Sequence, residues 1–238
     1  MITILKTAVE KVTHVIHLAD AHIRSNQRHE EFREVFTRLY EDIKKSNENT
    51  IVVFAGDLLH QKVEISPESL QLASEFIKNI ADIRPLILIA GNHDAILSNK
   101  NRMDSITPIV NSLNHPNVYY LRESGLYGFA NILFNNMSVF DEPEKYTLGK
   151  DIPSVYKNKY DRIIGLFHGA VHNVKTENGM ILENLSIQTP LFDHMDAVLM
   201  GDIHLCQDME METDEIVISK DKLSDYNVDC WEIVEEIE

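Results

Sequence analysis

The chain has 238 residues, of which 44% are hydrophobic and 25% are charged. This ordinary globular mixture excludes a fibrous repeat and a chain that is disordered throughout, and the length favours one domain with a sizeable core. The formal net charge of −16 argues against a broad surface that follows a phosphate backbone.

The negative charge is concentrated near the C-terminal end. Residues 208–238 contain 12 acidic residues and two lysines, so the other 207 residues carry a net charge of only −6. Two divalent cations would bring that part to about −2, so a polyanionic substrate is not excluded. We interpret the acidic stretch as a solvated face or a partly mobile tail.

The sequence indicates a soluble intracellular protein without membrane association, in the cytoplasm or the nucleus. No apolar run approaches the ~20 residues that cross a bilayer, and the first 14 residues lack a signal-peptide cleavage pattern. The two cysteines, Cys206 and Cys230, are too few for a disulfide scaffold, which suits a reducing compartment.

The N-terminal half alternates expected strands and helices. Runs rich in Val and Ile at 13–19, 50–55 and 85–90 are typical of buried parallel strands. Helices are expected between them, with the apolar faces Phe32, Val35, Phe36, Leu39 and Ile43, and Leu70, Ala73, Ile77 and Ile80. Ser66 and Pro67 would begin the second helix. This pattern predicts an open α/β sheet with right-handed crossovers, which binds ligands at the carboxyl ends of its strands.

The remaining elements are less regular. We expect a short helix at 104–111, strand-like pieces at 117–121 and 127–134, and buried strands at 162–167 and 197–200. We take residues 1–207 as one domain and 208–238 as an acidic segment, and we expect no further capping domain.

Each of the five buried strands ends in residues that bind metals. The strings are Asp20-Ala21-His22, Gly56-Asp57, Gly91-Asn92-His93-Asp94, His168-Gly169 and Gly201-Asp202-Ile203-His204. Their carboxylate, amide and imidazole groups suit Mn, Mg, Fe or Zn. Two cations ~3.5 to 4 Å apart can clamp a phosphoester and generate hydroxide near neutral pH. Five such strings in order therefore indicate a phosphoesterase metal centre.

The order of these motifs resembles the calcineurin-like metallophosphoesterase superfamily. Within it, HLADAHIR, FAGDLLHQK and GNHDAILSNKNRMDSITPIV are similar to double-strand-break repair nucleases of the SbcD and meiotic-recombination type. The resemblance implies a four-layer α/β/β/α sandwich with two mixed sheets flanked by helices. It also implies a DNA exonuclease or endonuclease in repair or recombination, with two divalent metal ions, Mn foremost and Mg or others as alternatives.

The resemblance assigns roles to the motif residues. One metal would be held by Asp20, His22, Asp57 and His204, and the second by Asp57, Asn92, His168 and Asp202. His93 would donate a proton to the leaving group or stabilise the transition state, with Asp94 helping to orient it. The family usually has His where this chain has Asp202, and a carboxylate also binds Mn or Mg, so we expect altered electronics and a retained metal.

Other residues and partners are expected with less support from the motifs. Arg24, Arg28, Lys100 and Arg102 are candidates for phosphate contacts, whereas His17 is interpreted as a core residue and His60 carries no independent signal. The resemblance implies DNA as a partner, a homodimer, and an SMC-like ATPase partner. The ATPase expectation is the weakest of these, because only 34 strongly acidic residues follow His204.

Two other functions remain open. The same site could serve a metallophosphatase or phosphodiesterase acting on small phosphoesters or phosphoproteins. The chain could also be a non-catalytic scaffold that retains the fold, a hypothesis that only Asp202 supports. The loop sequence at 99–104 favours the nuclease, because it resembles the region that follows the third motif in that family.

Overall fold

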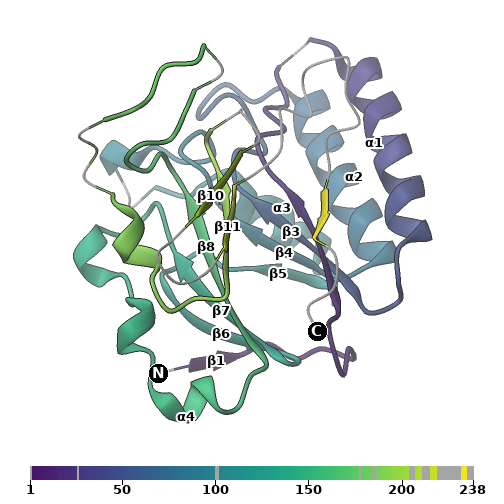
Figure 1. Ribbon diagram of the computed structural model, residues 1–238. Helices are drawn as coiled ribbons and strands as arrows, with labels where there is room; N and C mark the ends of the chain where they lie inside the picture. The colour runs from purple at the N-terminus through teal and green to yellow at the C-terminus, as the bar shows by residue number, and fades with distance from the viewer. Residues whose placement is uncertain are drawn as a thin grey trace.

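The computed structural model describes residues 2–25, 27–99, 102–176, 178–183, 185 and 187–203, and the backbone of three later strands at 207–210, 215–218 and 232–234. Two β-sheets lie face to face, and the long helices cover the outer face of one of them (Figure 1). Within the described part of the chain, no helix is long and apolar enough to cross a membrane.

The smaller sheet has five strands in the order β12-β2-β3-β4-β5. These strands are Glu232–Val234, His14–Leu18, Thr50–Ala55, Leu86–Ile89 and Val118–Tyr120. The strands from β2 to β5 pair in parallel, and β12 pairs antiparallel with β2. The predicted parallel β-α-β-α-β arrangement is therefore confirmed.

Three helices pack on this sheet: α1 (His29–Lys45), α2 (Pro67–Ile83) and α3 (Ile106–Leu113). The first two lie side by side on the right of Figure 1. Apolar residues on one side of each strand, such as Ile16, Val52 and Phe54, form one core with the inner faces of the helices. This core fixes the strands whose ends carry the motif residues.

The apolar faces of both long helices largely follow the prediction. Helix α1 buries Phe32, Phe36, Leu39 and Ile43 and packs Val35 at the margin. Helix α2 begins as expected, because the Ser66 hydroxyl accepts a hydrogen bond from the Ser69 N–H at 3.2 Å. Its predicted face is wrong at Leu70, which is 42% exposed, because the buried face is centred further round the helix. The residues on that buried face are Leu72, Ala73, Phe76, Ile77 and Ile80.

The larger sheet has seven strands in the order β1-β6-β7-β8-β9-β11-β10. These strands are Ile2–Ile4, Gly125–Phe129, Ile132–Met137, Arg162–His168, Ala197–Gly201, Glu215–Ile218 and Gln207–Glu210. It is a mixed sheet, because β6 pairs antiparallel with β7 and β10 with β11, whereas β7, β8 and β9 pair in parallel.

The two sheets share a central apolar layer. Val53 and Ile87 of the smaller sheet meet Phe134, Ile164 and Leu199 of the larger one. The outer face of the larger sheet is covered by α4 (Ser154–Lys157) and by 3-10 turns at Pro143–Lys145, Gly149–Asp151 and Thr189–Phe192. The predicted α/β/β/α class is confirmed, with a thin outer layer on this side.

The acidic stretch contributes strands to both sheets. The backbone of β10 and β11 extends the larger sheet beyond β9, and β12 lies beside β2 in the smaller one. Pairing in these three strands differs from the solvated tail that the charge pattern suggested, because a charge count does not register apolar residues such as those of Glu215–Ile218. The expected domain boundary after residue 207 stays a prediction.

His17 lies buried on β2, in the interior. Its ring forms a hydrogen bond with the Met200 backbone, and burial lowers its pKa to about 3. The other ring nitrogen, Nε2, has no hydrogen-bond partner among the described residues. His17 is therefore a neutral core histidine that is only partly satisfied by hydrogen bonds.

Candidate metal centre

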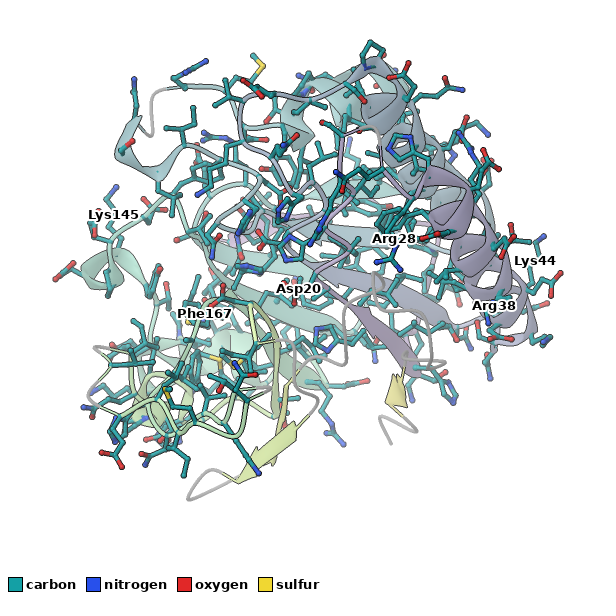
Figure 2. The ribbon with its side chains drawn as sticks, turned by 90° about the horizontal axis from the view of Figure 1, so that it is seen from above. Asp20, Arg28, Arg38, Lys44, Lys145 and Phe167 are labelled. Carbon is teal, nitrogen blue, oxygen red and sulfur yellow. The ribbon has the colours of Figure 1, made fainter. Side chains whose placement is uncertain are left out.

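The carboxyl ends of β2, β3, β4, β8 and β9 meet at one edge of the paired sheets. They bring together six predicted ligands, which we call the strand-end cluster: Asp20, His22, Asp57, Asn92, His168 and Asp202. In the view from above, Asp20 lies near the middle of the molecule, between Arg28 and Phe167 (Figure 2). The seventh predicted ligand, His204, lies outside the described residues.

Backbone contacts join the strand ends directly. The N–H of Asp20 donates to the Gly56 carbonyl at 3.0 Å, and the N–H of His22 donates to the Asp57 carbonyl at 3.0 Å. Across the two sheets, the Asp202 N–H donates to the Asp20 carboxylate, 3.0 Å from Oδ2. These bonds fix the carboxylates before any ligand arrives.

The strand ends are conformationally strained. Asp20, His22, Asp57 and Asp202 all adopt positive φ angles, of 56°, 46°, 59° and 89°. Such backbone costs about 1–3 kcal/mol per residue and is typical of functional sites, where the surrounding structure holds it in place. The strain re-aims side chains that regular strands would send to opposite faces, which a sequence pattern does not show.

Two glycines allow the strand ends to approach this closely. A Cβ on Gly91 would lie 2.1 Å from Asp57 Oδ1, and a Cβ on Gly201 would lie 2.4 Å from the Ala55 carbonyl oxygen. Both distances are far below ordinary contact, so any larger residue would push the strands apart.

Asp57 lies at the centre of the cluster. Its Oδ2 is 3.5 Å from His22 Nε2 and 3.4 Å from His168 Nε2, while its Oδ1 accepts the His93 N–H at 2.7 Å. Ligand atoms of Asp20, Asp57 and His168 all lie within 4.8 Å of one another. A carboxylate that faces imidazoles on two sides has the position required of a bridging ligand.

His168 shows that the cluster fits a cation. Its Nδ1 lies 2.7 Å from the Ala55 carbonyl oxygen, which makes Nδ1 the donor and turns Nε2 toward Asp57 and Asp202. Nε2 is buried and has no hydrogen-bond partner among the residues described. A buried nitrogen that carries a lone pair and faces two carboxylates is suited to a divalent metal, and the Ala55 carbonyl supplies the orienting contact that such ligands have.

Asp202 takes part in the same cluster. Its Oδ1 lies 3.8 Å from His168 Nε2 and accepts a hydrogen bond from Asn92 Nδ2 at 2.7 Å. The carboxylate that replaces the usual family histidine is therefore close to two other predicted ligands of the second metal. This proximity agrees with a retained site whose donor set has one more oxygen.

The charges of the cluster are strongly coupled. Burial raises the pKa of Asp20 to about 7, and the neighbouring carboxylates Asp57 and Asp202 raise it further against the charge of His168. Burial opposes charge on His168, yet Asp57, Asp20 and Asp202 together raise its pKa to about 10. Asp57 has a pKa below its usual value, because His168, the His93 N–H and His22 outweigh burial. Without a metal, protonated His168 supplies the positive charge, so metal binding must release its proton.

His93 lies beside the cluster and is oriented by a different group from the one expected. Its Nδ1 lies 2.7 Å from the carbonyl oxygen of His60, and its ring packs edge-on against His22 with centroids 4.9 Å apart. Asp94, expected to orient this ring, has its carboxylate elsewhere. The expectation for Asp94 is corrected: it supports the backbone under Asp57.

Asp94 is an acceptor for four backbone N–H groups. Its Oδ2 accepts from Asp57 at 2.8 Å, from Gly91 at 2.9 Å and from Leu58 at 3.3 Å, and its Oδ1 accepts from Leu59 at 3.1 Å. Burial raises its pKa to about 7, and the charge of Asp57 adds to this effect. Asp94 thus fixes the turn that carries Asp57.

We expect Asp94→Ala to lower the free energy of unfolding by about 3 kcal/mol or more, because it leaves buried N–H groups without an acceptor. For a chain of this size, this loss corresponds to a melting temperature lower by roughly 6–12 °C. Urea-induced unfolding measures it, with the exposed Asp151→Ala as the matched control. A loss no larger than that of the control would contradict this role for Asp94.

Sequence reasoning missed His60, which lies between His22 and His93. Ligand atoms of these three histidines, the histidine trio, all lie within 4.8 Å of one another. The only sequence signal was its place at the end of the GDLLH string, three residues after Asp57.

The four basic candidates do not share one environment. Arg24 is exposed and lies close enough to His60 that, after burial, its charge is the main factor that lowers the pKa of that ring. Arg28 forms an ion pair with Glu31, Arg102 is exposed on the loop after β4, and Lys100 lies outside the described residues. Arg24 is therefore the best placed of them for a substrate phosphate.

Comparisons with known proteins agree with this geometry. The model of the calcineurin-like phosphoesterase family matches residues 13–206, which include every residue of the strand-end cluster. The chain belongs to this family. A phosphoesterase of this family hydrolyses phosphate esters with divalent metals, which the strand-end cluster is suited to hold.

One curated relative of this phosphoesterase is the uncharacterized protein R555 of Acanthamoeba polyphaga mimivirus, 41% identical over 206 residues. The match covers 84% of the chain but only 15% of that relative. A candidate 5′-nucleotidase from Staphylococcus aureus, solved with alpha-ketoglutarate, is 12% identical with a TM-score of 0.53 over 94% of the chain and 54% of its own. A phosphopantetheinyl hydrolase from Mycobacterium tuberculosis is 10% identical with a TM-score of 0.47, covering 90% and 91%. These structures share the fold; the narrower resemblance to SbcD-type nucleases stays a prediction.

Proposed function

We propose that this phosphoesterase hydrolyses phosphodiester bonds in DNA with two divalent cations, manganese foremost, in repair or recombination. The observation that carries the proposal is the position of Asp57 between the imidazoles of His22 and His168, 3.5 and 3.4 Å away. The DNA substrate rests on the motif strings around this cluster, which resemble the SbcD-type nucleases. His204, outside the described residues, would complete the first metal site.

The residues of the chain would divide the reaction between them. The cations, when bound, supply Lewis-acid stabilisation and lower the pKa of a water molecule. Asp20, Asp57 and Asp202 hold three negative charges against the four positive charges of the cations, which leaves a net charge near +1 that attracts phosphate. His93 Nδ1 donates to the His60 carbonyl, so Nε2 is the atom that passes a proton to the leaving oxygen.

A second candidate is a phosphatase or phosphodiesterase that acts on small phosphoesters or phosphoproteins. The pairing of Arg28 with Glu31 favours it, because an engaged arginine contributes less to a DNA backbone contact. The low basic charge near the site points the same way. The scaffold hypothesis is the least supported, since six predicted ligands converge.

Substrate preference separates these candidates. Labelled linear DNA with Mn²⁺ is expected to be degraded faster than 4-nitrophenyl phosphoesters are hydrolysed at equal enzyme concentration. Asp57→Asn, prepared in parallel, controls for contaminating nucleases. Faster hydrolysis of the small esters would favour the phosphatase, and absence of both activities in metal-loaded protein would favour the scaffold.

Asp202 should set the metal preference of the second site. We expect Asp202→His to shift the Mn²⁺ to Zn²⁺ activity ratio toward Zn²⁺ by roughly tenfold, because imidazole suits zinc better than a carboxylate suits it. Rates at matched metal saturation measure the ratio. An unchanged ratio would show that Asp202 does not contact the metal.

Two partners are proposed from the family resemblance alone. One is a second copy of the chain, and the other is an SMC-like ATPase. Because the chain spans only 15% of the length of its curated relative, we propose these partners for the whole protein.

A further inference from the structure

His60 lies where it can act on two site residues at once. It follows β3 on the loop that also carries Asp57, and it is half-buried. Its ring packs edge-on against His22, with centroids 5.3 Å apart at 74°, and is nearly parallel to His93, 5.2 Å away at 19°. The two neighbours have different proposed roles, since His22 is a metal ligand and His93 is the proton donor.

The ring of His60 contacts the nitrogen of His22 that faces away from the carboxylates. His22 Nε2 is turned to the cluster, 3.5 Å from Asp57 Oδ2 and 3.8 Å from Asp20 Oδ1. His22 Nδ1 lies 3.4 Å from His60 Nδ1. If Nε2 offers its lone pair to a metal, the neutral ring must carry its proton on Nδ1. His60 Nδ1 is then the acceptor of that proton.

The backbone of His60 acts separately on His93. Its carbonyl oxygen accepts from His93 Nδ1 at 2.7 Å, which leaves His93 Nε2 to face a substrate. This second contact does not depend on the His60 side chain. Substitutions of His60 therefore test the ring alone.

We propose that His60 is a positioning residue whose ring Nδ1 accepts the His22 Nδ1 proton and so holds His22 Nε2 toward the first metal. The inference rests on the proposed metal centre. Orienting partners of ligating histidines typically contribute 10–100-fold to metal affinity. A role of this kind requires a ring acceptor at the δ position and no contact between His60 and the substrate.

The chemistry argues against a separate cation bound by the histidine trio. His22 can offer a lone pair from Nδ1 only if Nε2 carries the proton, which would remove it as a ligand of the first metal. His93 Nδ1 is already engaged by the His60 carbonyl. A cation on the trio would therefore compete with the first metal site.

The test is Mn²⁺ affinity without substrate, measured from the electron paramagnetic resonance signal of free Mn²⁺. His60→Leu and His60→Asn are matched in shape, but only Asn places an acceptor oxygen at the δ position. We expect His60→Leu to weaken the affinity of one site 10–100-fold and His60→Asn to restore most of it. At saturating Mn²⁺, both variants should recover turnover.

His115→Leu is the matched control, because His115 forms an ion pair with Asp82 at 3.2 Å at the amino-end side of the smaller sheet. It should bind Mn²⁺ as the unmodified chain does. Equal affinities for His60→Leu and the unmodified chain would overturn the proposal, and so would His60→Asn binding as weakly as His60→Leu. A raised KM with unchanged Mn²⁺ affinity would instead make His60 a substrate contact. Because the affinity is read without substrate, a wrong proposed function would show separately, as metal binding without phosphoester hydrolysis.

Discussion

Asp57→Asn is expected to reduce phosphoester hydrolysis by about a thousandfold or more, the loss that follows when several kcal/mol of metal-based transition-state stabilisation disappear. Asp57 faces His22 and His168 across 3.5 and 3.4 Å, so one substitution affects both metals. Asn keeps the size of the side chain and an oxygen that can still accept the His93 N–H. The fold should therefore remain while the bridging charge is lost.

The measurement has two parts. Metal content should fall below that of the unmodified chain after equal Mn²⁺ loading and desalting, while the melting temperature stays close to it. Asp42→Asn, in an exposed carboxylate of α1 that contacts Lys45 at 2.9 Å, should change neither. Full activity in Asp57→Asn would show that hydrolysis occurs elsewhere in the chain.

His93→Gln is expected to lower turnover by roughly 10²–10⁴-fold, the usual contribution of a general acid, while two metals remain bound. The reason is geometric, because His93 lies beside the ligands and its Nδ1 is held by the His60 carbonyl at 2.7 Å. Gln keeps a donor for contacts but cannot pass a proton.

The leaving group gives this prediction its control. 4-Nitrophenolate leaves without needing a proton, whereas an alkoxide of DNA needs one. His93→Gln should therefore affect DNA cleavage much more than hydrolysis of a 4-nitrophenyl ester. Equal losses on both substrates, or a loss of metal, would make His93 a ligand or an electrostatic contact instead.

The positions of the metal-binding side chains could be predicted because parallel strands end at one edge of a sheet. Asp20, Asp57 and Asn92 follow β2, β3 and β4, and His168 and Asp202 follow β8 and β9. Strand identity alone brings such residues together. The Ser66 cap and the buried face of α1 could also be predicted, because they depend on neighbouring residues in the sequence.

Contacts between distant loops could not be predicted. Asp94 accepts N–H groups from residues 35 to 37 positions earlier, and no spacing rule assigns a carboxylate to another loop's backbone. The role of His60 depends on a ring contact with His22 across two loops. The strands of the acidic stretch pair with β9 and β2, which charge patterning does not indicate.

Anomalous scattering from crystals soaked in Mn²⁺ tests the central claim most directly. We predict two peaks ~3.5 to 4 Å apart, with Asp57 coordinating both and His168 Nε2 facing one of them. Absence of peaks at the strand-end cluster, or a single ion that Asp57 does not touch, would contradict the two-metal centre.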